Sequence, residues 1–272
     1  MKRFSLFIAI IFSLKAVAFD VQPWFPYPYE FHFRPNYLAA YYPNVNGATN
    51  PTSYNAWNQE LYLNFGMNTM SQFDTQIEAG FFNTSKTNAT FQSAAMMGRY
   101  LLLDDVQGDP VSVAIGLSLR YVPGHALTDV FTPFHNRVNL EANCAVGKEF
   151  DNLQYWLYRL YGVASVGMAN QGAPWVKGLG AFEFNASDNR NQCAIQVDSC
   201  FGFGSQDFVN INRFNGYAKI WHQNVDVSAI FRHLFDIWGT LSVELGYRVY
   251  AKNYPENLVF ARFKYDLPFS IF

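Results

Sequence analysis

Histidines are the residues of this chain whose chemistry could most directly support catalysis. A lipid-hydrolysing site needs a histidine beside a serine nucleophile and a polar group that orients the ring. His222 is followed by Gln223–Asn224 and has no serine nearby, and three of the others fall in predicted loops or turns. The sequence also lacks metal-ligand clusters, glycine-rich phosphate loops and nucleophile elbows. It therefore predicts no catalytic residue, no metal site and no cofactor. The five histidines are His32, His125, His135, His222 and His233.

The three cysteines, Cys144, Cys193 and Cys200, match no zinc or redox spacing. Cys193 and Cys200 are seven residues apart, so on one strand they would face opposite sides and could not bond to each other. At most one disulfide is possible, from Cys144 to either of the others. The alternative, which we favour, is that all three are small apolar residues.

Charged residues stand at alternate positions within several long apolar segments. In Val111–Tyr121 the odd positions are bulky and apolar, and the even positions are small or polar. Segments 240–249 and 259–271 repeat the pattern. A period of two residues indicates a strand. Strands of ten or more residues exceed the ~5–6 of a globular protein and match the ~9–11 that cross a bilayer. We therefore expect one face of each strand to contact lipid and the other a polar lumen.

The whole pattern predicts an all-β chain, a single-domain antiparallel transmembrane β-barrel of about 12 strands. An even number returns both chain ends to the same side of the membrane, and 10 or 14 strands are the alternatives. The connections alternate between short turns, expected on the periplasmic side, and longer loops, expected outside. The predicted strands are 30–41, 58–68, 72–82, 90–103, 110–121, 137–148, 154–167, 175–185, 191–203, 215–231, 240–252 and 257–271.

This facing predicts which charged side chains line the lumen. Seven cations and eight anions point inward on the predicted strands, so strong ion selectivity is not indicated. The same charges could instead pair across the lumen and fill it. The residues predicted to line a pore are Arg34, Asp74, Glu78, Arg120, Glu141, Arg159, Glu183, Glu244, Arg248, Arg262, Lys264 and Asp266, with Lys177, Asp198 and Asp226 on the same inward faces.

The N-terminal residues predict export. A basic start, Lys2–Arg3, precedes eleven apolar or serine residues and the small-residue site Ala16–Ala18, which together form a secretory signal peptide. We expect residues 1–18 to be removed near Ala18-Phe19 and residues 30–272 to form the barrel. Residues 19–29, rich in proline and aromatics, are expected to be an N-terminal periplasmic extension, with the mouth of the barrel as another place they could occupy.

Composition supports a membrane barrel and excludes a nucleic-acid partner. Half of the residues are hydrophobic and 18% are aromatic, a content that a barrel displays to lipid and at the two interfaces. A secreted β-sandwich also alternates, but its outward positions would be charged rather than Gly, Ser and Asn. Cleavage at residue 18 leaves 16 basic residues against 21 acidic ones, a net charge of −5. A nucleic-acid-binding protein would present a basic patch instead.

The signal sequence, the alternating segment Phe260–Phe272 and the terminal Phe272 resemble bacterial outer-membrane β-barrel proteins as a class. The resemblance implies location in the outer membrane and recognition of the last strand by the barrel-insertion machinery. Phe272 departs from the pattern, because it is out of phase with Phe269 and Ile271, and Pro268 removes a ladder donor. A bulge would reset the phase, or the signal would be read from Phe269 and Ile271.

Three functions fit such a barrel. The one we favour is a porin-like channel for passive passage of small polar solutes with weak ion selectivity. The first alternative is a non-catalytic structural or adhesive surface barrel, whose Asn-rich loops at 42–57, 122–136 and 204–214 would make its contacts. The second is a lipid-modifying barrel enzyme, which the histidine positions disfavour. The expected partners are therefore the lipid bilayer, the insertion machinery and small polar solutes.

Overall fold

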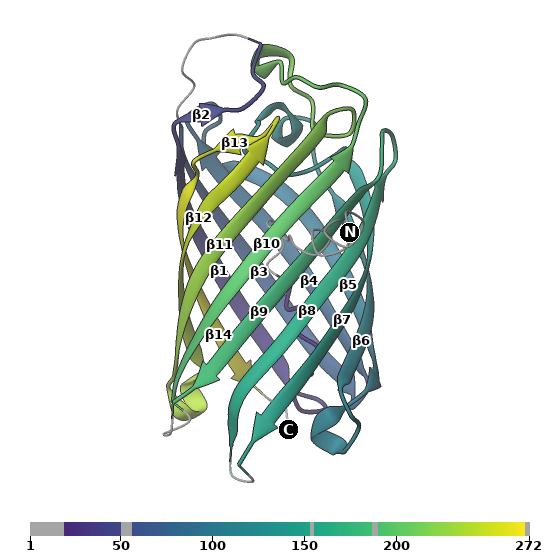
Figure 1. Ribbon diagram of the computed structural model, residues 1–272, viewed down its shortest axis with the longest axis vertical. Helices are drawn as coiled ribbons and strands as arrows, with labels where there is room; N and C mark the ends of the chain where they lie inside the picture. The colour runs from purple at the N-terminus through teal and green to yellow at the C-terminus, as the bar shows by residue number, and fades with distance from the viewer. Residues whose placement is uncertain (1–18, 50–55, 153–154, 187–189, 270–272) are drawn as a thin grey trace, which may run out of the picture.

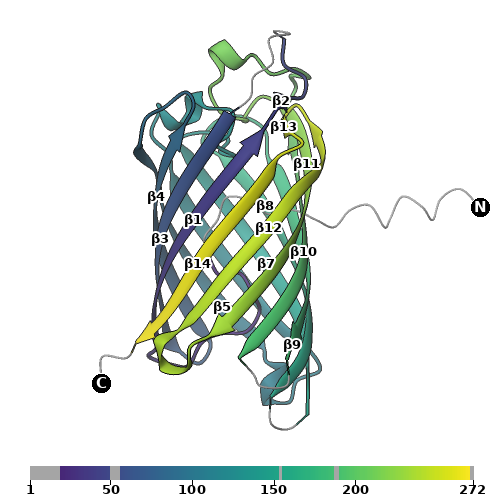
Figure 2. The same ribbon diagram turned by 90° about the vertical axis from the view of Figure 1, so that its left-hand side faces the viewer.

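The computed structural model describes residues 19–49, 56–152, 155–186 and 190–269. Twelve antiparallel strands form one closed barrel, in which each strand pairs with its neighbours along the chain and β1 pairs with β14 to close the wall (Figures 1 and 2). The strands of the barrel are β1 (Phe31–Tyr42), β3 (Ala56–Met70), β4 (Phe73–Thr84), β5 (Thr90–Leu103), β6 (Ser112–Tyr121), β7 (Val138–Asp151), β8 (Trp156–Ala169), β9 (Trp175–Asn185), β10 (Asn191–Phe203), β11 (Trp221–Leu234), β12 (Thr240–Lys252) and β14 (Val259–Phe269).

The predicted fold class and the predicted number of twelve strands are confirmed. Eleven strands lie within a few residues of their predicted bounds. The exception is the segment predicted as one strand over 215–231, because β11 begins only at Trp221. Residues 215–220 belong to a loop, in which Gly216 has φ +77 and Tyr217 and Ile220 are buried. Their apolar side chains thus mark burial in the loop rather than a lipid-facing strand.

The barrel is apolar outside and polar inside. On β6, Ile115, Leu117 and Leu119 point outward with 43% to 56% of their surface exposed, whereas Arg120 is buried in the interior. Backbone donors and acceptors are paired around the closed ring, which a strand surrounded by lipid requires. In the part of the chain that the structure describes, no helix has the length and apolar character needed to cross a membrane.

The two ends of the barrel differ. Long connections gather at the upper end in Figure 1, here called the loop end, and short ones at the lower end, here called the turn end. The turn end carries the 3-10 helices η1 (Asp105–Gln107) and η4 (Asp236–Trp238). At the loop end, β2 (Asn44–Val45) and β13 (Pro255–Glu256) form a small antiparallel sheet. It joins the loop after β1 to the loop before β14.

Two loops fold over the loop end and pack on the inner wall. We call residues 122–137 and 204–220 the lid; they contain η2 (Ala126–Thr128) and η3 (Ile211–Arg213). The Tyr217 hydroxyl donates to the Val130 carbonyl at 2.6 Å, and the Tyr217 backbone N–H donates to the Phe134 carbonyl at 3.0 Å. Lid side chains such as Phe131 and Phe214 are buried in one cluster with wall residues of β1, β3 and β14.

The predicted signal peptide, residues 1–18, lies outside the described residues, as do Ile271 and Phe272 of the predicted insertion signal. Residues 19–29 are described, and we call them the N-terminal segment. They enter the barrel from the turn end, where Tyr27 and Tyr29 are exposed, and reach Phe19, which is buried against Ala95 and Met97 on the inner wall. Along the chain, this stretch therefore begins in the lumen at Phe19 and ends at the mouth of the barrel at Tyr29.

Candidate functional site

The N-terminal segment packs on an apolar patch of the inner wall. Val21, Trp24 and Phe25 contact a buried cluster formed by β5 to β9. Within that cluster, Tyr161 lies edge-on to Trp24, with ring centroids 5.6 Å apart. Burial of these apolar surfaces stabilises the segment by about 25 cal/mol for each Å² removed from water.

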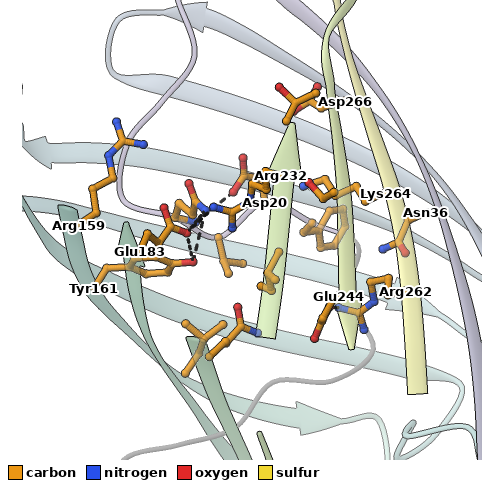
Figure 3. A pocket seen from close by; sticks show the side chains of 18 of the residues that line it. Asp20, Asn36, Arg159, Tyr161, Glu183, Arg232, Glu244, Arg262, Lys264 and Asp266 are labelled. Atoms are coloured by element: carbon orange, nitrogen blue, oxygen red, sulfur yellow. Dashed lines mark hydrogen bonds and ion pairs between the residues drawn. The ribbon is translucent and has the colours of Figure 1, made fainter. Parts of the chain in front are cut away.

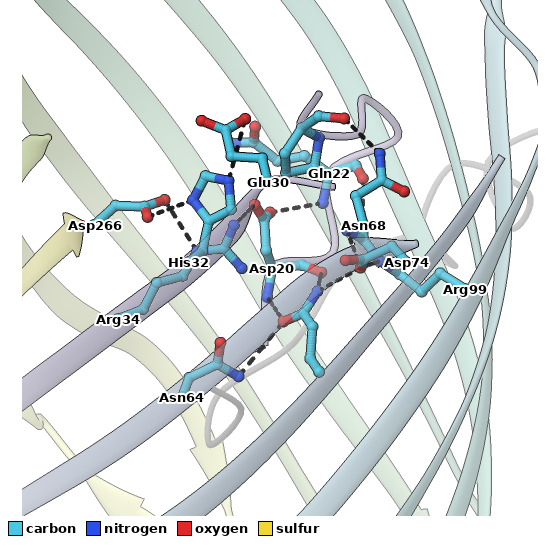
Figure 4. A network of polar contacts seen from close by, with 12 residues as sticks. Asp20, Gln22, Glu30, His32, Arg34, Asn64, Asn68, Asp74, Arg99 and Asp266 are labelled. Carbon is cyan, nitrogen blue, oxygen red and sulfur yellow. Dashed lines mark hydrogen bonds and ion pairs between the residues drawn. The ribbon is translucent and has the colours of Figure 1, made fainter. Parts of the chain in front are cut away.

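Polar contacts fix the register of the N-terminal segment (Figure 4). The Asp20 N–H donates to the Gln76 side-chain oxygen at 2.9 Å, and the Gln76 amide returns a hydrogen bond to the Asp20 carbonyl at 3.0 Å. Arg99 donates to the Gln22 carbonyl at 2.6 Å, and the Gln22 amide donates to Glu183 at 3.1 Å. These bonds join the segment to β4 and β5 on one side and to β9 on the other.

A buried carboxylate holds the segment at the turn end. The Trp24 indole N–H donates to Asp105 at 2.9 Å, and the Glu149 backbone N–H donates to the other carboxylate oxygen of Asp105 at 2.6 Å. Burial raises the pKa of Asp105, but hydrogen bonds from Glu149, Ser112 and Trp24 outweigh it and hold this pKa below its ordinary value of 3.8. Asp105 therefore stays ionised as the acceptor at this junction.

A cavity of about 310 Å³ remains between the N-terminal segment and the inner wall. Its lining comes largely from β8 to β12 and β14, together with Phe19 to Gln22 of the segment. Amide, hydroxyl and charged groups dominate this wall, and Figure 3 shows their side chains converging from opposite sides. The cavity is therefore a polar space inside a closed barrel.

Seven of the twelve residues predicted to line a pore line this cavity. Arg262 donates to Glu244 at 2.9 Å, and Arg159 donates to Glu149 at 2.6 Å. The cavity thus has most of its charges in ion pairs that run along its wall. The seven residues are Glu141, Arg159, Glu183, Glu244, Arg262, Lys264 and Asp266.

The other five predicted residues lie in the interior but do not line this cavity. Arg248 binds Asp226 through two nitrogens at 2.7 and 3.0 Å, and both side chains are buried. Such closed pairs fill the space between the wall, the lid and the N-terminal segment. The five are Arg34, paired with Asp266; Asp74, paired with Arg99; Glu78 and Arg120, paired with each other; and Arg248.

Two arginines of the interior were not among the predicted residues. Arg99 binds Asp74 at 2.7 Å, and Arg232 binds Glu183 at 2.9 Å and lines the cavity. Arg99 lies on β5, whose inward face also carries Ala95 and Met97. Those apolar residues obscure the alternation of β5, because they face the N-terminal segment rather than water. The alternation of polar and apolar residues would therefore predict that Arg99 points inward only if the position of the N-terminal segment were already known.

Two inward glycines of this barrel, Gly202 and Gly246, make room for aromatic rings. A Cβ atom on Gly246 would lie 1.9 Å from the Phe260 ring, and one on Gly202 would lie 2.0 Å from the His222 ring. At each position the missing glycine side chain leaves space on the inner wall for the ring of the paired residue on the neighbouring strand. That ring fills the space.

Histidines and cysteines form no catalytic arrangement in the described part of the chain. None of the histidine rings there is hydrogen-bonded to a serine, and no group of three or more His, Cys, Asp or Glu residues could hold a metal ion within the same residues. The three cysteines are free; Cys193 is exposed on the outside and Cys200 lies near His222 in the interior.

His135 belongs to the lid and lies against Trp175 of β9 and His222 of β11. The His135 ring stacks on Trp175 with centroids 3.7 Å apart and lies 5.1 Å from the His222 ring. Burial lowers the pKa of His135 well below its ordinary value of 6.5, and the nearby His222 and Lys177 lower it further. His135 is therefore neutral while the lid is closed.

Comparison with known proteins places the fold among outer-membrane channels. A scan against protein-family models finds no match, and a search of curated proteins finds none. An outer membrane channel from Pseudomonas putida F1 matches with a TM-score of 0.69 and 11% identity, over 93% of this chain and 100% of that chain. The NanC porin matches with a TM-score of 0.53 and 11% identity, over 87% of this chain and 98% of that chain. The KdgM porin matches with a TM-score of 0.51 and 8% identity, over 88% and 99%.

These similarities show that the chain has the closed-barrel fold of bacterial outer-membrane channels and porins. The class-level resemblance drawn from the sequence is confirmed at the level of the fold.

Proposed function

We propose that this protein is a porin-like channel of the bacterial outer membrane that passes small polar solutes by diffusion. The observation that carries the proposal is the polar cavity of about 310 Å³ inside a closed barrel with an apolar outer surface. Solved structures with this fold are named as an outer membrane channel and as porins. The loop end would face outward and the turn end the periplasm.

Weak ion selectivity follows from the charges along the cavity. Glu183 and Glu244 are neutralised by arginines across the wall, and Glu141 by Lys177. A wall of balanced ion pairs produces little net field along the path, so it does not favour one sign of ion strongly. The twelve residues predicted to line a pore remain proposed pore residues. Those that line the cavity would contact the solute directly.

The N-terminal segment and the lid would set how wide the path is. The segment occupies one side of the lumen, and the lid packs apolar side chains across the loop end. We propose that residues 1–18 are removed on export and that the mature chain begins at Phe19, inside the lumen. N-terminal sequencing of membrane-fraction protein should read Phe19 first. A retained Met1 would contradict export by this signal.

Single-channel recording of the full mature chain in planar bilayers tests the channel. Discrete conductance steps are expected, small because the segment and the lid narrow the path. Replacing Phe131 and Phe214 of the lid by serine should raise the conductance, because it removes apolar burial that holds the lid closed. A silent bilayer for both proteins, each showing the folded heat-modifiable band on gels, would overturn the channel.

The proposed role is non-catalytic, in keeping with the names of the structures that share the fold. One observation favours a structural or adhesive barrel as the second candidate, namely the lid buried across the loop end. That role predicts no conductance from either the wild type or the lid variant. The last strand, β14, would be read by the barrel-insertion machinery in both cases.

A further inference from the structure

The lumen cavity contains a row of polar side chains that crosses three neighbouring strands. Lys264 on β14 is paired in register with Asn36 on β1 and with Ser242 on β12. All three line the cavity. Figure 3 shows Lys264 and Asn36 on the same side of it. The row offers an ammonium flanked by an amide and a hydroxyl.

Lys264 differs from the other cations of the cavity. Arg159, Arg232 and Arg262 each bind a glutamate, whereas Lys264 makes no ion pair with any described residue. The nearest acids are already engaged: Arg34 binds Asp266 at 2.9 Å and approaches Asp20 at 3.6 Å. His32 also lies 2.7 Å from Asp266 (Figure 4). The Lys264 ammonium therefore faces the cavity with donors to spare.

Asn36 supplies a second, independent observation. Asn36 is 4% exposed, and its amide oxygen is buried with no hydrogen-bond partner among the described residues. A buried acceptor left without a donor is unfavourable, and a solute hydroxyl at this point would supply the missing donor. The cavity thus presents a cation for an anion and, beside it, an acceptor for a hydroxyl.

We propose that this cavity binds a small hydroxylated carboxylate, with its carboxylate on Lys264 and a neighbouring hydroxyl on Asn36. The inference rests on the proposed channel and names the class of solute that the channel holds in transit. Ser242 lies on the other side of Lys264 and can donate to the same carboxylate. A volume of about 310 Å³ lies at the lower end of the range for ligand pockets, which suits an acid of about six carbons.

Three solutes with one carbon skeleton separate charge from shape: D-gluconate is anionic, D-sorbitol is neutral and N-methyl-D-glucamine is cationic. Binding of each to the full mature chain in detergent is measured by isothermal titration calorimetry. D-gluconate should bind most tightly. Lys264→Gln should weaken D-gluconate binding by about tenfold, the effect of one hydrogen bond to a charged group, and leave D-sorbitol unchanged.

Matched variants distinguish the loss of the proposed site from the loss of a positive charge elsewhere in the protein. Lys264→Arg keeps the cation and should retain D-gluconate binding, while Asn36→Ala should weaken it. Lys219→Gln removes an exposed lysine of the lid, outside the cavity, and should have no effect. Each variant is first checked for the folded heat-modifiable band, and if Lys264→Gln does not fold, Asn36→Ala with Lys264→Arg carries the comparison.

The outcomes distinguish the site from the channel. Equal binding of the three solutes, or D-gluconate binding that neither Lys264→Gln nor Asn36→Ala weakens, would overturn the proposed site. Reversal potentials in potassium gluconate gradients then report on passage. Conductance without D-gluconate binding would leave the channel standing and refute the site. Binding that depends on Lys264 in a silent bilayer would support the site and refute passive passage.

Discussion

Trp24 and Asp105 join the N-terminal segment to the turn end of the barrel. The indole N–H of Trp24 donates to a carboxylate that also accepts the Glu149 backbone N–H. The Arg159 guanidinium lies over the Trp24 ring, 4.7 Å from the ring centroid. The segment is therefore held where it enters the lumen, so its position inside the barrel depends on this junction.

Replacing Trp24 by Phe tests this junction. The change removes one hydrogen bond, with a net contribution of about 1 kcal/mol, and keeps most of the apolar ring. We expect larger and noisier single-channel conductance, because the segment would leave the wall more often. Tyr27→Phe is the control, since Tyr27 belongs to the same segment but is 82% exposed. Identical recordings from both variants would show that the junction does not restrict the lumen.

The facing of β6 predicts opposite outcomes for two adjacent positions. Leu117 points outward and is 56% exposed, whereas Ser118 lines the cavity. Leu117→Arg places a charge on the lipid face and should cost about 2–4 kcal/mol near the midplane. Ser118→Asn should be tolerated in the polar lumen. Heat-modifiable migration on gels measures assembly of each variant, and equal assembly of the two would contradict this facing.

Two arginines on neighbouring strands should respond differently to charge reversal. Arg248 is sealed in a buried pair with Asp226. Arg248→Glu leaves two acids together, and loss of a buried pair costs about 3–5 kcal/mol. We expect the variant to lose the folded heat-modifiable band or to unfold at lower denaturant. A fully stable Arg248→Glu protein would mean that the pair is solvated.

Arg262 lines the cavity of about 310 Å³ beside Glu244. Arg262→Glu should therefore keep the barrel assembled and shift ion preference toward cations, through the field at the cavity wall. Reversal potentials under a salt gradient measure the shift, with Lys219→Glu as a control outside the lumen. If ion preference stays unchanged while conductance persists, ions do not pass this wall.

Acid should loosen the lid. The pKa of His135 is depressed by burial in the closed lid, but a solvated ring titrates near 6.5. Protons therefore bind the open or unfolded form more readily, so the contribution of His135 to lid stability is full above about pH 6.5 and falls as the pH drops below it. Proteolysis of the lid should speed up between pH 7.5 and 5.5.

His135→Phe should weaken this pH dependence, because it keeps a stacked ring on Trp175 without a titrating group. His125→Phe is the matched control, since His125 lies in the same loop and is exposed. A lid whose rate of cleavage is the same at both pH values would show that His135 remains neutral throughout.

The strands and their facing could be predicted because lipid and lumen impose a strict period of two residues. Leu117 and Arg120 lie on the faces that their parity predicts. Where the inner wall is apolar, the pattern weakens. Ala95 and Met97 point inward on β5 against Phe19 and Val21, a contact between segments far apart in sequence that alternation cannot detect.

The alternating pattern also could not predict which residues form ion pairs with each other. Alternation places Arg34 inside, but its partner Asp266 lies on a strand at the other end of the chain. Only the closing register of the barrel brings them together. Lys264 likewise becomes distinctive only when the partners of its neighbours are known.

The pairing of β1 with β14 gives assembly a fixed final step. Each other pair of wall strands joins neighbours along the chain and can form locally, whereas this seam must wait until the last strand exists. The entropy of closing so long a loop grows only logarithmically with its length, so the delay affects folding rate more than final stability. Until the seam forms, β1 and β14 are two unpaired edges, each able to pair with another chain. Misassembly of this barrel should begin there, and the small sheet of β2 and β13 can form only once those edges have met.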